Sequence, residues 1–187
     1  MTLQEYLDME RIAEYPSDYY DGEIFPKIHD SLPHGQIVVN VGREISSRLK
    51  GGSCRAAGSA TRLRVAMRKL VYPDLIIVCG EPKFAEDGES LLNPKAIVEV
   101  SSPSTEGYDY SRKFELYQAL PSFVEYVLVA QDSVKVNVFR RSSASEWVLR
   151  RYEGLQESVP IDSVGISIPM AEIYDGVAMP SPAAQYQ

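Results

Sequence analysis

The sequence predicts an α/β fold built around a mixed β-sheet. Apolar residues recur every four positions from Ile37 to Leu49, as in a core helix, and two continuous apolar runs, 71–79 and 96–100, have the length of buried strands. Helix-like and strand-like segments alternate along the chain. With 187 residues, 44% of them hydrophobic, the chain is long enough for one domain with its own core. We expect that domain to cover residues 1–177 and the residues 178–187 to form a mobile tail.

Local signals define the expected elements in chain order. Thr2 and Glu5 form a capping box before a short first helix, and Asp21-Gly22 favours a hairpin turn. Pro33 begins the helix with the four-residue repeat, and Gly51-Gly52 ends it. The other expected elements are strands near 53–57, 61–66, 71–79 and 96–100, a helix from 107 to 119 and a strand from 123 to 130. Two further strands, at 134–140 and 146–152, are expected to pair, and the first of them should have one solvent-exposed face.

Several classes of protein are excluded by composition and segment length. The N-terminus has no basic start followed by an apolar stretch, so we expect no signal peptide. No apolar run approaches the roughly 20 residues of a membrane helix, which favours a cytoplasmic protein without a membrane partner. Two cysteines are too few for a disulfide framework and lack metal-ligand spacing. Cys79 ends an apolar run and is expected to be a buried free thiol.

The charge is unevenly distributed. The whole chain has a net charge of −7, but the segment from Asn40 to Tyr72 contains eight basic residues and one acid, Glu44. This segment is either a solvated basic face or a surface that contacts phosphates on an otherwise acidic body. In the second interpretation, DNA is the partner and the candidate contacts are Arg43, Arg48, Arg55, Arg62 and Arg64.

Two carboxylates occupy places where a buried strand should be apolar. Asp74 interrupts the run 71–79, and Glu99 interrupts the run 96–100. A carboxylate in such a place costs several kcal/mol, to order of magnitude, unless it is paired or bound to a cation. Adjacent strands lie about 4.8 Å apart, so both acids could meet at one ion, and oxygen ligands suit Mg²⁺ or Mn²⁺. The alternative is a solvated strand end or an ion pair with Arg64 or Lys95.

Lys113 is the third candidate residue. In the expected helix 107–119, Asp109, Lys113 and Tyr117 follow one another at intervals of four and share a face. That face either forms an ordinary surface pair between Asp109 and Lys113 or leans over the end of the sheet where the two acids lie. The two histidines, His29 and His34, have no acidic or cysteine partner at ligand spacing, and we assign them no role in chemistry.

Together these motifs resemble a known family. The stretch VYPDLIIV, followed by NPKAIVEVSSPSTEGYDYSRKFELY, closely resembles the Uma-type restriction endonucleases of the PD-(D/E)XK nuclease superfamily. The YDGEI hairpin, the helix that opens near His34 and the terminal GISIPMAEIY stretch are also similar, so the resemblance covers the chain from about Thr2 to Val177.

The resemblance implies a restriction-endonuclease-like sheet flanked by helices, with an α-β-β-β-α-β core and extra β-hairpins. It implies a catalytic set of Asp74, Glu99 and Lys113, with Ser101 at the superfamily's usual lysine position and the lysine moved to the following helix. Asp74, Glu99, the Val100 carbonyl and Glu23 would bind Mg²⁺ or Mn²⁺, and Glu44 is a more remote candidate. The implied reaction is hydrolysis of DNA. Cutting both strands needs two sites, so we also expect a homodimer, in which the β-rich end from Val134 to Tyr152 could pair across a two-fold axis. The alternative is a non-catalytic module for DNA binding or protein interaction that retains the fold.

Overall fold

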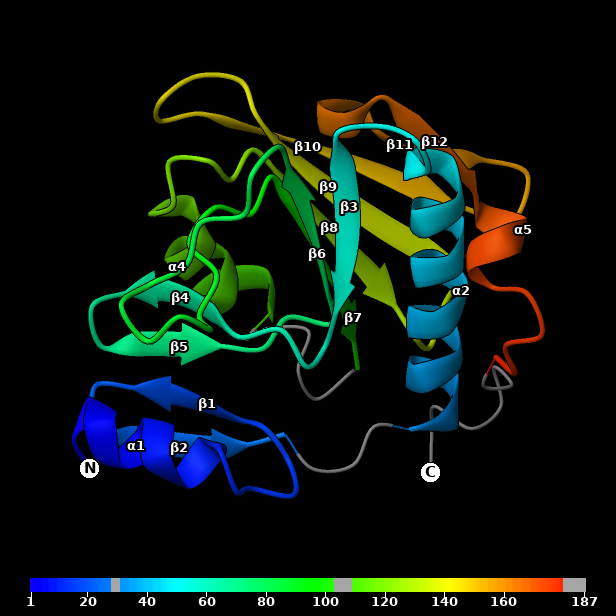
Figure 1. Cartoon of the computed structure of the whole chain (residues 1–187). Coiled ribbons are helices and arrows are strands. Elements are labelled where there is room, and N and C mark those ends of the chain that lie inside the picture. Colours follow the sequence, from blue (N-terminus) through cyan, green and yellow to red (C-terminus); the bar gives the residue numbers. More distant parts are fainter. Residues whose placement is uncertain (28–30, 103–108, 180–187) are drawn as a thin grey trace.

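The computed structural model describes residues 1–27, 31–102 and 109–179. Its largest sheet has six strands in the order β10-β9-β8-β7-β6-β3, with β7 and β8 parallel and the other neighbours antiparallel (Figure 1). The predicted mixed sheet is therefore confirmed. Its strands are β3 (Cys54–Gly58), β6 (Leu75–Cys79), β7 (Ala96–Ser101), β8 (Glu125–Ala130), β9 (Lys135–Arg141) and β10 (Trp147–Glu153).

Helix α2 (Leu32–Leu49) covers one face of this sheet (Figure 1). The predicted apolar stripe is confirmed, because Ile37, Val41, Ile45 and Leu49 are buried in one cluster with side chains of the sheet. The hydroxyl of Ser31 caps the helix by accepting the His34 N–H at 3.2 Å. The same face also packs against a short helix, α5 (Met170–Ile173), and a two-stranded sheet of β11 (Ser158–Ile161) and β12 (Ile166–Pro169).

The opposite face of the large sheet packs against a short helical segment. This segment begins as a π-helix, η1 (Asp109–Lys113), and continues as α4 (Phe114–Gln118). Phe114 and Tyr117 are buried there with the strand residues Ile97 and Tyr126. The helix expected from 107 to 119 therefore has a wider first turn, and its residues 107 and 108 lie outside the described part of the chain.

A second, four-stranded sheet of order β2-β1-β5-β4 lies on the same side as α4 (Figure 1). The predicted hairpin is confirmed, with its Asp21-Gly22 turn at φ values of 53° and 113°, the positive pair that suits this dipeptide. Helix α1 packs on this sheet, and its predicted capping box is present. The bounds are α1 (Leu3–Glu10), β1 (Ser17–Tyr20), β2 (Glu23–Pro26), β4 (Leu63–Ala66) and β5 (Lys69–Val71).

The run 71–79 was expected to be one strand, and this prediction is wrong. Val71 ends β5 in the small sheet and Leu75 begins β6 in the large one, so the chain crosses between sheets at Tyr72-Pro73-Asp74. Proline has no N–H for a strand ladder, which explains the break at this point. The order α2, β3, β6, β7, α4, β8 reproduces the expected α-β-β-β-α-β core, with β4 and β5 as an inserted hairpin.

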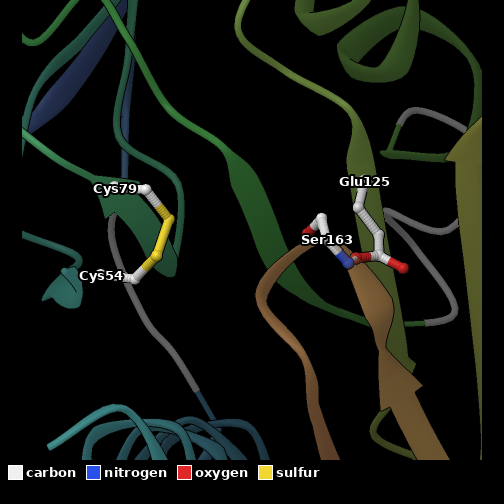
Figure 2. Close-up of a disulfide and its surroundings, with 4 residues drawn as sticks. All are labelled: Cys54, Cys79, Glu125 and Ser163. Atoms are coloured by element: carbon white, nitrogen blue, oxygen red, sulfur yellow. Dashed lines mark hydrogen bonds between the residues drawn. A yellow bond between two sulfur atoms is a disulfide. The ribbon is translucent and has the colours of Figure 1, made fainter. Parts of the chain in front are cut away.

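Cys54 and Cys79 form a disulfide, so the expected free thiol at Cys79 is wrong (Figure 2). The two residues are direct partners across β3 and β6, with their Cα atoms 3.9 Å apart. The neighbouring pair is joined by a hydrogen bond from the Gly80 N–H to the Ser53 carbonyl, at 2.9 Å. The cysteines therefore occupy a non-hydrogen-bonded position, where opposite side chains lie closest.

Glu125, the first residue of β8, connects the large sheet to the C-terminal part of the chain (Figure 2). Its fully buried carboxylate accepts the backbone N–H groups of Asp162 and Ser163, at 3.2 and 2.9 Å, and pairs with Arg140 at 3.3 Å. These N–H groups belong to the first turn of η2 (Asp162–Val164), which joins β11 to β12. This part of the fold is therefore held by hydrogen bonds to a buried carboxyl group and not by apolar contacts alone.

The predicted pairing of the last two sheet strands is confirmed, because β9 and β10 are antiparallel partners. The expected wet face of β9 is not found, since its residues from Val136 to Phe139 are all buried. Within the described residues, no helix has the length and apolar character needed to span a membrane.

Candidate active site

Asp74 lies at the crossing between the two sheets, where its carboxylate is 4% exposed. The Oδ2 atom accepts the backbone N–H of Val100 at 2.8 Å and lies 3.2 Å from Nε2 of His34, at the start of α2. Burial alone raises the pKa of the Asp74 carboxyl, but the hydrogen bond from His34, the charges of Lys27 and His34, and the Val100 N–H outweigh it. The net pKa is below the ordinary value, so the group is an anion at neutral pH.

Glu99 lies on β7, one residue before the strand residue that binds Asp74, and is 2% exposed. Strand alternation turns its side chain to the α4 side of the sheet, with Ile97. There its Oε1 atom lies 3.1 Å from Nζ of Lys113 and accepts the hydroxyl of Tyr117 at 2.7 Å. Burial, and then the charge of Glu99, hold the pKa of Tyr117 well above its ordinary value, so the hydroxyl remains a donor.

Two hairpin residues that the sequence interpretation did not select also lie at the site. Asp18 of β1 is buried and accepts the Tyr72 N–H at 2.8 Å, while the Nζ atom of Lys27 donates to the Tyr72 carbonyl. Lys27 Nζ lies 3.7 Å from Oδ1 of Asp74. Burial raises the pKa of Asp18, although the charges of Lys113 and Lys27 act in the opposite direction. The site is thus a group of anions and cations at the seam between the two sheets.

The oxygen donors fit a hard divalent cation. Asp74 and Glu99 supply carboxylates, and Val100 presents its N–H and its carbonyl to the same strand edge, where Asp74 binds the N–H. Mg²⁺ binds one or two carboxylates and completes its shell with waters and phosphate oxygens, so a protein set of this size is sufficient. Among residues 1–27, 31–102 and 109–179, no three His, Cys, Asp or Glu side chains are close enough to hold a metal together.

Glu23 is not brought to this group. It is exposed, beside the hairpin turn and opposite Tyr20, and the described residues do not include a three-carboxylate site that it could complete. Glu44 lies on α2 and pairs with Arg43 and Arg48. His29 lies outside the described residues, as do residues 107 and 108 of the helix that was expected to contain Lys113.

The basic segment does not form a single surface of unpaired cations. Arg43 pairs with Glu44 and Glu172, Arg48 pairs with Glu44, and Arg64 pairs with Glu86. Arg55 is exposed on β3. Arg62, another predicted phosphate contact, is 7% exposed and donates to Ser90 at 2.8 Å and Glu89 at 2.9 Å.

Arg62 instead helps to hold the loop 85–90, and Asp87 is the central acceptor of that loop. Its carboxylate accepts the N–H groups of Glu89 and Ser90 at 2.9 and 2.7 Å and lies 3.5 Å from Arg62. Burial acts to raise the pKa of Asp87, but the Ser90 hydroxyl, the two N–H groups and Arg62 outweigh it and lower the pKa.

Asp87 should therefore stabilise the protein at neutral pH and not in acid. The folded pKa lies below the unfolded value of about 3.9, so the contribution is complete above pH ~4 and is lost as pH falls below it. We expect Asp87→Asn to lower the free energy of unfolding by about 1–2 kcal/mol at pH 7, and by less at pH 3. Urea unfolding of both proteins at the two pH values measures the difference. Asp8→Asn, in an exposed pair, is the control, and a pH-independent loss at Asp87 would contradict the explanation.

Comparisons with known proteins identify the fold and then the family. A crystal structure described as a putative nuclease belonging to DUF820, from Anabaena variabilis, superposes with a TM-score of 0.74 at 20% identity, covering 93% of this chain and 97% of that one. This likeness establishes the restriction-endonuclease-like fold predicted from the sequence. The family model Uma2, "Putative restriction endonuclease", matches residues 3–171, and the chain belongs to that family.

Two uncharacterised proteins of Synechocystis sp. are similar over most of their length. One is 29% identical over 95% of this chain and 93% of its own, and the other is 30% identical over 82% and 88%. The resemblance inferred from the motifs around Asp74, Glu99 and Lys113 is thus confirmed at the level of the family.

Proposed function

We propose that the protein is a Mg²⁺- or Mn²⁺-dependent endonuclease that hydrolyses phosphodiester bonds of DNA. One observation supports this proposal above all: two consecutive residues of β7 bind the other two members of the set, because Glu99 lies 3.1 Å from Lys113 and the Val100 N–H donates to Asp74 at 2.8 Å. Two buried anions and a lysine in such proximity are costly for stability and are typical of a site that binds a cation and a phosphate.

In this proposal Asp74, Glu99 and the Val100 carbonyl hold the metal. When bound, Mg²⁺ or Mn²⁺ lowers the pKa of a water molecule and neutralises charge on the phosphate. The His34 side chain and the Val100 N–H orient the Asp74 carboxylate. Tyr117 fixes Oε1 of Glu99 and leaves less freedom for that side chain. In-line attack of water on phosphorus would leave a 5′-phosphate and a 3′-hydroxyl.

Lys113 forms an ion pair with Glu99 inside the site. A neutral Lys113 would take away the cation at 3.1 Å from the buried Glu99 carboxylate, and one of the two positive charges, of Lys113 and Lys27, that act on Asp18. We therefore propose that the ammonium group orients the attacking water or binds the scissile phosphate, and that it does not accept the proton of the water.

Plasmid cleavage tests the proposal. Supercoiled DNA is incubated with Mg²⁺ or Mn²⁺ and the wild-type protein, and nicked and linear products are quantified. We expect Asp74→Ala and Lys113→Ala to lower the rate by about 10²-fold or more, because each removes a charge that acts on the phosphate or on its metal. Lys83→Ala, a change to an exposed lysine, should cleave like the wild type. Equal rates in all four proteins would reveal a contaminating nuclease and refute the site.

A non-catalytic module remains the second candidate, and one observation favours it. Arg43, Arg48, Arg62 and Arg64 already pair with acids of the same chain, so few of the predicted contacts are available to DNA without rearrangement. Calorimetry with Mn²⁺ separates the two candidates. Binding that is lost in Asp74→Ala supports the nuclease, and the absence of binding supports the module.

A homodimer is proposed as the form that cuts both strands. Strand β10 is the last strand at its edge of the large sheet, and Val148 and Leu149 on it are 48% and 40% exposed. Pairing of two such edges around a two-fold axis would join the sheets of two copies.

A further inference from the structure

The candidate site contains two lysines, and they differ in exposure. The side chain of Lys113 is 8% exposed and lies 3.1 Å from Glu99, which is itself buried. The side chain of Lys27 is 25% exposed and lies next to the other acid of the site, Asp74. Lys27 is thus the cation of this pair that a ligand can approach from solvent.

The position of Lys27 is fixed by backbone contacts on both sides. Its N–H donates to the Pro16 carbonyl at 2.9 Å, which extends the β1–β2 pairing by one step. Its ammonium group donates to the Tyr72 carbonyl, and the N–H of the same residue is bound by Asp18. The hairpin therefore holds the lysine against the crossing that contains Asp74, and little side-chain entropy remains to be lost when a ligand binds.

The need to neutralise the charge of Asp74 does not by itself explain why Lys27 lies at this position. Asp74 already accepts the Val100 N–H at 2.8 Å and lies 3.2 Å from His34, whereas Lys27 remains at 3.7 Å, beyond hydrogen-bond distance. An ammonium group has three protons. Among the described residues, Lys27 directs one to Tyr72 and at most one toward Asp74, so a third is available to an acceptor from outside.

We infer that Lys27 contacts a phosphate of the nucleic-acid backbone and is a substrate-binding residue on the Asp74 side of the site. This inference rests on the proposed function, because it assumes that the site receives a phosphodiester. A phosphate oxygen would accept this third proton, and the negative charge of the phosphate would lie next to the exposed cation.

The salt dependence of DNA binding tests this inference without any hydrolysis. A fluorescein-labelled duplex of about 20 base pairs is titrated in EDTA at several salt concentrations, because each phosphate contact adds about 0.9 to the slope of log affinity against log salt. We expect Lys27→Met to weaken binding about tenfold and to reduce the slope by about 1, with Lys27→Arg close to wild type. In cleavage assays, Lys27→Met should raise KM more than it lowers kcat.

Lys69→Met is a matched control. Lys69 lies on the same small sheet and pairs with Asp21 at 3.6 Å, a distance close to that between Lys27 and Asp74, but at the opposite end of the hairpin. An unchanged salt slope in Lys27→Met, or an equal loss in Lys69→Met, would overturn the inference. The two proposals can fail separately. If the salt slopes of the wild type and Lys27→Met differ as expected but the wild type does not cut DNA, the proposed hydrolysis is refuted and the phosphate contact stands.

Discussion

Replacing Lys113 with methionine is expected to destabilise the folded protein by about 3–5 kcal/mol, because it removes the cation that lies 3.1 Å from the buried Glu99 carboxylate. The same change should lower DNA cleavage by about 10²-fold or more if the ammonium group acts on the water or the phosphate. Urea unfolding measures the first effect, and plasmid cleavage, below the unfolding transition, measures the second.

A double variant separates the two effects. In Glu99→Gln/Lys113→Met both charges are removed, and the glutamine can still accept the Tyr117 hydroxyl. We expect this variant to recover most of the lost stability, since a neutral pair leaves no buried ion without a partner. Cleavage should stay as low as in the single variant. Recovery of cleavage together with stability would mean that Lys113 has only a structural role.

Reduction of the disulfide between Cys54 and Cys79 is expected to have the next largest effect. The bond closes a loop with a sequence separation of 25 residues, and opening a loop of this length releases entropy in the unfolded chain worth about 3 kcal/mol. Urea unfolding with and without a reducing agent gives the difference.

The double variant Cys54→Ser/Cys79→Ser is the control for this experiment. It should show the lower stability under both conditions and no response to the reducing agent. If the wild type were also insensitive, while free-thiol titration showed that its cysteines had been reduced, the disulfide would make no net contribution to stability.

The sequence was sufficient for most of the elements and for the acids Asp74 and Glu99, because their signals are local, but not for the division of the run 71–79 between two sheets. The repeat from Ile37 to Leu49 and the Asp21-Gly22 turn each determine one element without reference to the rest of the chain. Asp74 and Glu99 were noticeable as charges within apolar runs. Their surroundings could not be read in the same way, since they depend on which strands become neighbours.

The residues missed at the site illustrate this limit. Asp18 follows Pro16-Ser17 and does not interrupt an apolar run, so the criterion that selected Asp74 gave no signal for it. Lys27 and His34 had no such signal, because only the packing of the hairpin and of α2 against the sheet crossing brings them to Asp74. The pairing of Cys54 with Cys79 likewise follows from the register of β3 on β6, and spacing along the chain does not encode it.

The π-helical turn before α4 has a consequence for how this site can change. A regular α-helix rotates by about 100° per residue about its axis. A turn that contains one extra residue therefore rotates the residues before it relative to the residues after it. Lys113 is the last residue of that turn, and Tyr117 lies four positions further on, with both in contact with the same oxygen of Glu99. Deleting a single residue between Asp109 and Lys113 would thus rotate the backbone at Asp109 by about a quarter turn about the helix axis relative to this oxygen, with Glu99, Lys113 and Tyr117 all still present.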